Sequence, residues 1–414
     1  MCVPDSNRGS RRESNRSTPE RVAGIGQRVG GFRLASVTPV LEPAATAWFA
    51  GVQARGAVEA ADLAEQPDAL SRPGWWAVVG EFEGRVRAWR FAEVRTGRFA
   101  PAGAGAWAGP SAAAWRSSMD REQYVAAVES IRRRIRAGDV YQVNLCRVLD
   151  ADLPAGPRGP DAAALARVLA AGNPAPFAGG VQVGPTPDDA GVWVVSASPE
   201  LFLAVEGSSI TTGPIKGTAR EPDGLTAKDR AENVMITDLV RNDLQPVCLP
   251  GSVEVVRLLD EERHPGLVHL VSTVTGRLAP EVRGSGDSWL RILAATYPPG
   301  SVSGAPKSSA LRLINELEPV PRGPYCGAVG WVHVAGDGAV SARLAVGIRT
   351  FWWTEGVLRF GTGAGITWGS EAADEWAETE LKAARLVALA SQAPGRAGGT
   401  PADRTGEADA RVRP

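Results

Sequence analysis

The spacing of apolar and polar positions changes several times along the chain, and each change predicts a different element. Between residues 75 and 98 apolar and polar residues alternate around two glycines, which predicts a β-hairpin. From 118 to 138 apolar residues instead recur every three or four positions, which predicts an amphipathic helix. Ser118 is its candidate N-cap, and Gly138 is its candidate end.

The rest of the chain mixes both kinds of pattern without strict alternation. Strand-like runs occur at 140–148, 192–197, 209–212, 329–334, 343–350 and 357–361. Helical patterns occur at 229–242, 303–316 and 371–389. Because strands and helices do not follow one another in turn, the fold class is expected to be α+β and not doubly wound.

Composition bounds the size and the ends of the folded part. The chain has 414 residues, of which 44% are hydrophobic and 22% are charged, as in a globular protein of one large domain or two ordinary ones. Residues 1–35 are rich in Arg, Ser, Asn and Gly, and residues 391–414 repeat Ala, Gly, Pro, Arg and Asp. Both ends are therefore expected to be disordered tails.

Charge and cysteine content exclude some classes of function. The net charge of -1 provides no general attraction to nucleic acid or to an anionic membrane, so no nucleic-acid partner is expected. No run of about 18 apolar residues is present, so no membrane span is expected either. The cysteines are scattered and lack metal-ligand spacing, which favours a reduced, cytoplasmic protein: Cys2, Cys146, Cys248 and Cys326.

Four carboxylates lie on two of the expected helices. Asp229 and Glu232 are three residues apart, as are Glu375 and Glu378, so each pair shares one helix face. A divalent cation between the helices would remove the cost of burying these charges, and oxygen ligands suit magnesium. The alternative is that both pairs belong to ordinary solvated faces.

A lysine and a glutamate are candidates for covalent and acid catalysis. Lys216 stands between Ile215 and Gly217 after a strand, and a desolvated lysine there could act as a nucleophile; a surface loop lysine is the alternative. Glu200 ends an apolar strand, where burial would raise its pKa and make it a general acid. The alternative for Glu200 is a solvated carboxylate at a strand end.

Further candidates suit recognition of a carboxylate ligand. Arg349, Tyr325 and the glycine-rich run at 363–366, expected to be a loop, offer a guanidinium, a hydroxyl and backbone N–H groups. His269 lies within an apolar run, where a core histidine is the alternative to a catalytic one.

The order of these groups along the chain resembles that of the chorismate-utilising enzymes. The matching motifs span about residues 120–389: GDVYQVNL (138–145), SPE (198–200), PIKGT (214–218), ENVMITDLVRNDL (232–244), HLVS (269–272), GSVSGAPK (300–307), YCGAVG (325–330), IRT (348–350), GAGI (363–366) and EWAET (375–379). The resemblance implies two antiparallel β-sheets packed as a sandwich with helices outside. It divides the chain into a divergent N-terminal part at 36–115 and a chorismate-binding catalytic domain at 116–390.

The same resemblance implies roles for the candidate residues. Glu232 and Glu378 match direct Mg²⁺ ligands, and Asp229 and Glu375 match ligands that act through water. Glu200 matches the acid that protonates the departing 4-hydroxyl group, and His269 matches an active-site histidine. The remaining matches are to substrate-binding positions: Tyr325, Arg349, Gly363, Ala364, Gly365, Thr218 and Lys382.

Two positions imply which reaction is catalysed. Gln142 replaces the lysine base of isochorismate and salicylate synthases, and Lys216 replaces the alanine usual in anthranilate synthases. In having lysine at position 216 the chain resembles many aminodeoxychorismate synthases. In those enzymes the lysine is thought to form a covalent bond to the ring before ammonia enters at C4. The resemblance thus implies amination of chorismate for 4-aminobenzoate and folate, with ammonia from a separate glutaminase subunit. Anthranilate synthesis is the alternative, and a non-catalytic relative that only binds chorismate is a third possibility.

Overall fold

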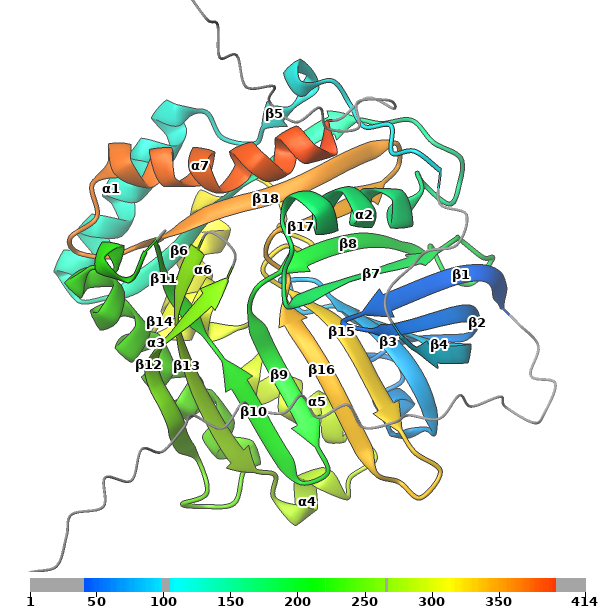
Figure 1. Cartoon of the computed structure of the whole chain (residues 1–414). Coiled ribbons are helices and arrows are strands. Elements are labelled where there is room, and N and C mark those ends of the chain that lie inside the picture. The colour runs from blue at the N-terminus through cyan, green and yellow to red at the C-terminus, as the bar shows by residue number, and fades with distance from the viewer. Residues whose placement is uncertain (1–40, 98–104, 220, 265–266, 392–414) are drawn as a thin grey trace, which may run out of the picture.

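The computed structural model describes residues 41–97, 105–219, 221–264 and 267–391. The expected tail at 1–35 and nearly all of the one at 391–414 lie outside these residues. Within the described part, all strand pairs are antiparallel and join into one network of 18 strands. The helices lie outside the strands (Figure 1), so the α+β class is confirmed.

The network follows a single path of neighbouring strands, which runs β12–β13–β10–β9–β16–β15–β3–β4–β2–β1–β7–β8–β17–β18–β6. The strands are β1 Glu42–Phe49, β2 Val52–Asp62, β3 Gly74–Gly80, β4 Val86–Thr96, β5 Arg116–Ser117, β6 Gln142–Asp152, β7 Phe177–Val183, β8 Val192–Ser198, β9 Leu201–Glu206, β10 Ser209–Gly213, β11 Ile215–Ala219, β12 Glu254–His264, β13 Leu267–Arg277, β14 Gly304–Ala305, β15 Ala328–Val334, β16 Val340–Val346, β17 Thr350–Thr354 and β18 Val357–Ile366. β11 pairs with β13, while β5 and β14 pair with β6.

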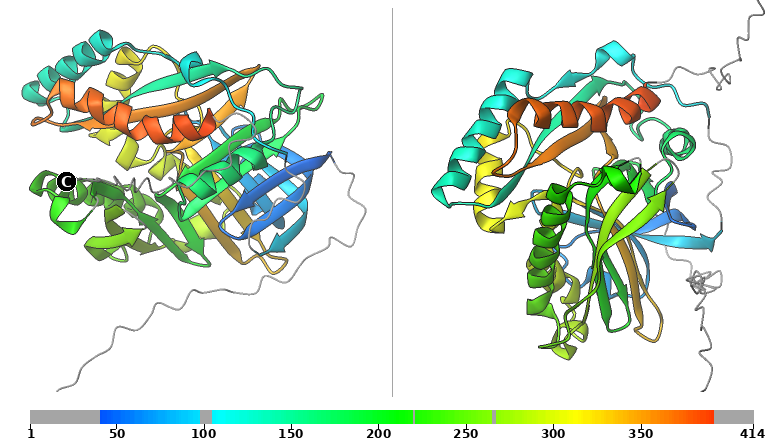
Figure 2. Two further views of the ribbon diagram at one scale, coloured as in Figure 1. Left: turned by 45° about the horizontal axis from the view of Figure 1, so that its top comes forward. Right: turned by 60° about the vertical axis from the view of Figure 1, so that its left-hand side comes forward.

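The path bends so that its two ends form two layers. In Figures 1 and 2 the layer that ends at β6 and β18 carries α1 and α7, and the layer that ends at β12 and β13 carries α3 and α5. The helices are α1 Arg121–Ala137, α2 Ala162–Gly172, α3 Ala227–Leu244, α4 Pro280–Arg283, α5 Ser288–Thr296, α6 Lys307–Leu317 and α7 Ala372–Ala390. The expected sandwich is therefore present, with β3, β4, β2 and β1 joining its layers.

Most expected elements are found, and several of their boundaries differ from the expected ones. The N-cap of α1 is Asp120, which forms a capping box with Gln123, whereas the Ser118 hydroxyl accepts from Val148 N–H. The helix expected at 303–316 begins only at Lys307, because Pro306 occupies its N-cap and the preceding residues pair with β6. The expected strand 343–350 is divided between β16 and β17.

A buried ion pair connects α6 to the core. Arg322 is 1% exposed, and its Nη2 donates to Glu318 Oε1 at 2.6 Å. The guanidinium also donates to the backbone carbonyls of Val302 and Asn144 at 2.9 and 2.7 Å. These bonds tie the end of α6 to β6 and to the segment before β14.

Replacing Arg322 by methionine should destabilise the fold strongly. The change leaves the Glu318 carboxylate buried without its partner, which costs about 3–5 kcal/mol and should lower the melting temperature by roughly 10 °C. Calorimetry measures this shift. The double variant Arg322→Met, Glu318→Leu should recover part of the loss, because no buried charge then lacks a partner. A single variant that melts like the wild type would contradict the assignment.

No helix among the described residues is long and apolar enough to cross a membrane. Cys146, Cys248 and Cys326 are buried free thiols. Cys2 lies outside the described residues.

Candidate functional site

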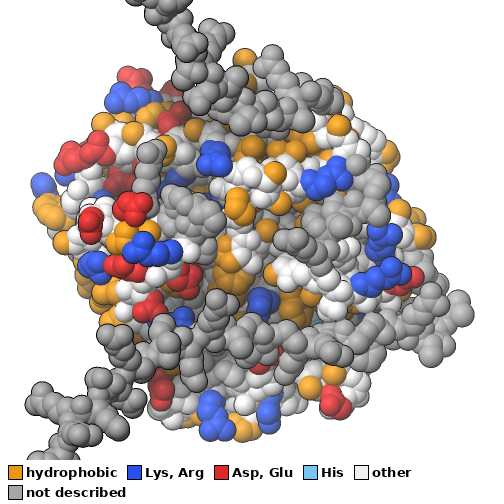
Figure 3. Space-filling view, in the orientation of Figure 1, with side chains coloured by type: hydrophobic (Ala, Val, Ile, Leu, Met, Phe, Trp, Pro, Cys, Tyr) orange, Lys and Arg blue, Asp and Glu red, His pale blue; other side chains and the backbone are white. Residues whose placement is uncertain are grey.

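Three of the four candidate carboxylates come together where α3 and α7 face each other across the layers. Lys228 on α3 connects the two helices: its Nζ lies 3.8 Å from Glu232 Oε1 and 3.5 Å from Glu375 Oε1. Glu378 lies one turn further along α7 and pairs with Lys382 at 2.6 Å. Figure 3 shows acidic and basic side chains gathered on the left-hand side of the molecule, over these helices.

The carboxylates interact electrostatically. Burial raises the pKa of Glu232, and the negative charges of Glu375 and Glu378 raise it further. Burial likewise raises the pKa of Glu375, with a contribution from Glu378. The pKa of Glu378 is lowered because Lys382, Lys216 and Lys228 outweigh the effect of burial. The site therefore concentrates negative charge that nearby cations stabilise.

Lys216 lies at the centre of this charge distribution. Burial raises the pKa values of Glu200 and Glu232, and the positive charge of Lys216 opposes that rise. The same charge contributes to the lowered pKa of Glu378, so Lys216 acts on carboxylates from three different segments. The Lys216 Nζ also lies 3.8 Å from the point where a side chain on Gly365 would begin. β11 thus places the amine, which is partly exposed, between the acidic cluster and β18.

Glu200 is a buried acid beside Lys216. It lies between β8 and β9 and is 4% exposed. Burial raises the pKa of its carboxyl to about 7, although Ser301, Lys216 and the Ile215 N–H favour the charged form. A carboxyl with this pKa is protonated in a substantial fraction of molecules near neutral pH and can donate a proton.

Arg349 is a half-buried guanidinium that suits an anionic ligand. Burial lowers its pKa, and no carboxylate of the described residues pairs with it. Its φ of 52° lies in the left-handed region, so the fold holds this residue in an unfavourable backbone conformation. Such strain is found mostly at functional sites.

The glycine-rich run at 363–366 is not the expected loop. It is the end of β18, where Gly363 pairs with Cys146 of β6. A Cβ on Gly361 would lie 2.0 Å from the Tyr325 ring, and one on Gly365 would lie 2.4 Å from Gln142 Nε2. The glycines thus make room for neighbouring side chains. Ala364 is buried at the same strand end.

Two of the other candidate residues lie beside β18 and its partner β6, and two lie elsewhere. Lys382 Nζ donates to the Gly363 carbonyl at 3.0 Å, and Tyr325 is buried with its hydroxyl 3.9 Å from Cys146 Sγ. His269 is buried on β13, where its backbone pairs with that of Thr218. Asp229 forms the capping box of α3, in which its Oδ2 accepts from Thr226.

The acidic cluster has the donor chemistry that a hard divalent cation requires. Carboxylate oxygens are the ligands that Mg²⁺ prefers. Glu232, Glu375 and Glu378 supply them, and the raised pKa of the first two shows that a cation would stabilise their charged forms. As arranged here, no group of three His, Cys, Asp or Glu side chains in the described residues could hold a metal ion. Lys228 and Lys382 pair with the carboxylates.

Two contributing residues were missed from the sequence. Lys228 stands four residues before Glu232, so its helical spacing was a signal that could have identified it. Ser301 hydrogen-bonds to the Glu200 carboxyl from a segment about 100 residues away. No local pattern predicts that contact.

Comparisons with known proteins identify a family and several relatives. The sequence profile described as "chorismate binding enzyme" matches residues 101–388. Aminodeoxychorismate synthase component 1 of Klebsiella aerogenes is 39% identical over 284 residues, which cover 66% of this chain and 58% of that protein. Anthranilate synthase component 1 of Arthrobacter globiformis is 38% identical over 278 residues, 63% of this chain and 49% of that protein. The chain therefore spans about half the length of these relatives.

Solved structures share the fold. Anthranilate synthase component I of Streptococcus pneumoniae superimposes with a TM-score of 0.65 at 23% identity, covering 89% of this chain and 95% of that one. The menaquinone-specific isochorismate synthase of Escherichia coli gives a TM-score of 0.66 at 17% identity, covering 87% and 93%.

Proposed function

The chain belongs to the family of chorismate binding enzymes, and on that premise we propose that it converts chorismate and ammonia into 4-amino-4-deoxychorismate. The observation that carries the proposal is the position of Lys216, whose charge acts on Glu200, Glu232 and Glu378 at once. A primary amine therefore lies close enough to interact with an acid whose pKa burial raises to about 7. Anthranilate formation is the second candidate, because relatives of both kinds have nearly equal identity.

In the proposed first step, Lys216 displaces the 4-hydroxyl group. Once the Lys216 ammonium group has lost its proton to solvent, the neutral Nζ forms a bond to ring C2, the double bonds shift, and the C4–O bond breaks. The Glu200 carboxyl donates its proton to the departing oxygen, which leaves as water.

In the second step ammonia replaces the lysine. Its nitrogen forms a bond to C4, the double bonds shift back, and the electron pair of the C2–N bond returns to Lys216. The new ammonium group gives a proton to the Glu200 carboxylate, which restores the acid. Two displacements through one amine place the new amino group at C4.

We also propose Mg²⁺ as the cofactor, with Glu232 and Glu378 as direct ligands and Asp229 and Glu375 as ligands through water. When bound, the ion would supply positive charge to the ring carboxylate of chorismate. Arg349, Tyr325 and the Gly363–Gly365 backbone would bind the enolpyruvyl carboxylate. We propose Lys382 and Thr218 as further substrate-binding residues, and His269 would border the ring.

The proposed nitrogen source is a separate glutaminase subunit, in keeping with the "component 1" in the names of the relatives. Ammonium salts should replace it in vitro, so this chain can be assayed alone.

The product distinguishes the two candidate functions. Purified protein is incubated with chorismate, MgCl₂ and ammonium chloride, and the products are separated by mass spectrometry. 4-Amino-4-deoxychorismate without pyruvate supports the proposal. Anthranilate together with pyruvate would replace it by the second candidate, and unchanged chorismate would point to a binding protein.

Replacing Arg349 by methionine should weaken chorismate binding. The variant loses a charge-assisted contact in a half-buried place, so the chorismate KM should rise about a hundredfold while kcat changes less. Initial rates over a range of chorismate concentrations measure both constants. Arg359→Met is a matched control, because Arg359 lies on β18 opposite Trp352 of β17, and among the described residues its guanidinium donates only to the Thr354 carbonyl. An unchanged KM in the Arg349 variant would remove this residue from the site.

A further inference from the structure

A small cavity lies directly behind the proposed acid. Its lining comes from β9 and the residue before it, the end of β10, the end of α3, and the end of α5 with the segment that follows. It includes Glu200, Thr212, Val240, Asp243, Thr296 and Ser301. The space open to the centre of a water-sized molecule is about 10 Å³. That volume holds about one water molecule or one ammonia molecule.

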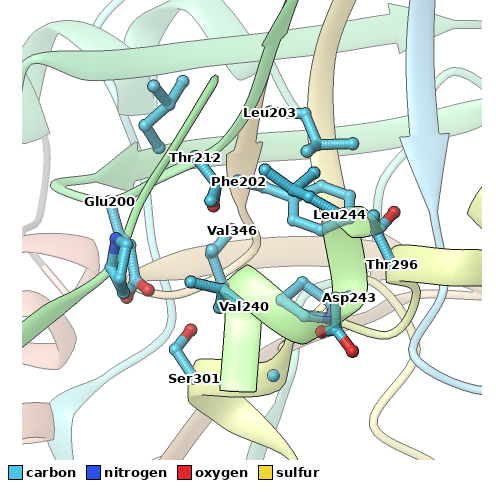
Figure 4. A pocket seen from close by; sticks show the side chains of 14 residues that line it. Glu200, Phe202, Leu203, Thr212, Val240, Asp243, Leu244, Thr296, Ser301 and Val346 are labelled. Carbon is cyan, nitrogen blue, oxygen red and sulfur yellow. The ribbon is translucent and has the colours of Figure 1, made fainter. Parts of the chain in front are cut away.

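The two ends of the cavity differ in chemistry. Figure 4 shows Glu200 and Ser301 at one end and Asp243 and Thr296 at the other, with Val240 between them. At the second end Asp243 Oδ2 pairs with Lys307 Nζ at 2.7 Å, and both side chains are partly exposed. The middle is lined by apolar side chains such as Phe202, Leu244 and Val346. The lining is thus polar at the Glu200 end, apolar in the middle and charged at the Asp243 end.

The Glu200 end has the polar groups that a small guest requires. An internal water needs two to four hydrogen-bonding partners. The Glu200 carboxyl and the Ser301 hydroxyl are bonded to each other, and the Thr212 hydroxyl lines the same cavity. These three groups can donate hydrogen bonds to one small molecule or accept them from it.

We propose that this cavity is a transit site for one small neutral molecule. It holds the water released from the ring and admits the ammonia that replaces it. The inference rests on the proposed function, in which both molecules exchange at C4 next to Glu200. Water and ammonia share the necessary size and hydrogen-bonding ability. Ser301 and Thr212 are its positioning residues, because they contact the guest and not the ring.

The exchange is balanced in each turnover. The C4–O bond breaks, the oxygen takes the Glu200 proton, and one water molecule leaves the ring. One ammonia then forms the C4–N bond and returns one proton to Glu200. One water molecule therefore leaves for each ammonia molecule that enters. A cavity that holds a single molecule is large enough for this exchange.

Filling the cavity tests the proposal. Val240→Ile and Val346→Ile each add one carbon to its lining, while Val205→Ile makes the same change on β9 in the core, outside the cavity. Rates are measured with ammonium chloride at saturating chorismate. If ammonia passes through the cavity, its KM should rise about tenfold in the two filled variants with the chorismate KM unchanged. If only water passes through the cavity, kcat should fall instead and the KM for ammonia should stay the same. Either result supports the transit site.

Kinetics of both filled variants within twofold of Val205→Ile, with normal melting temperatures, would overturn it. Should the variants not fold, a high-resolution crystal structure of the wild-type chain decides. An ordered water bonded to Glu200, Ser301 or Thr212 supports the proposal, and an empty cavity refutes it. A wild-type chain that makes no 4-amino-4-deoxychorismate would refute the proposed function itself, before any variant is compared.

Discussion

Replacing Lys216 by alanine is expected to lower the rate of 4-amino-4-deoxychorismate formation by about a thousandfold or more, because no other group supplies the covalent bond to C2. With the amine gone, ammonia can reach C2 directly, so the residual product should shift toward anthranilate and pyruvate. Mass spectrometry of the products from chorismate, magnesium and ammonium measures the rate and the ratio together.

Lys216→Arg is the matched control for charge. Arginine keeps a cation near Glu200, Glu232 and Glu378 but cannot be deprotonated to a nucleophile in a protein. Both variants should therefore lose amination at C4. If the arginine variant kept most of the activity, Lys216 would act through its charge and the covalent step would be wrong.

The sequence predicted those elements whose signals are local. α1 ends at Gly138, which has a φ of 85°, and the hairpin of β3 and β4 follows an alternating pattern around a short turn. Both depend on residues a few positions apart. The N-cap at Asp120 was missed because Ser118, two residues earlier, is an equally good cap by composition.

Contacts between distant segments could not be predicted from local patterns. Gly363 and Gly365 suggested a turn, but they lie within β18 because β6 pairs alongside and Gln142 fills the space that a side chain would need. In the same way, the bond from Ser301 to Glu200 and the bridge from Lys228 to Glu375 depend on how the two layers pack. Motif order identified the candidate residues, whereas only the fold identified which of them share a space.

Replacing Glu200 by glutamine is expected to lower kcat by about 10²–10⁴-fold, the usual contribution of a general acid. The amide keeps the size of the side chain but has no acidic proton for the departing hydroxyl group. The wild-type rate should fall as the pH rises above about 7, because the carboxyl whose pKa burial raises to about 7 then loses its proton. The residual rate of the variant should lack this decrease. Rates are compared at a fixed concentration of free ammonia.

Stability separates loss of the acid from damage to the fold. Because burial raises the pKa of Glu200 from the ordinary glutamate value of 4.5 to about 7, the folded state binds this proton more tightly than the unfolded chain does. This group therefore makes the wild type less stable as the pH rises from 4.5 to about 7. Lys216 and Lys382 face the carboxyl and limit this effect. Glutamine resembles the protonated form, so Glu200→Gln should melt no lower than the wild type at pH 8. Glu206→Gln, at the exposed end of β9, should alter neither rate nor melting temperature. A Glu200 variant that melts lower at pH 8, or keeps the wild-type pH profile, would show that Glu200 is not the acid.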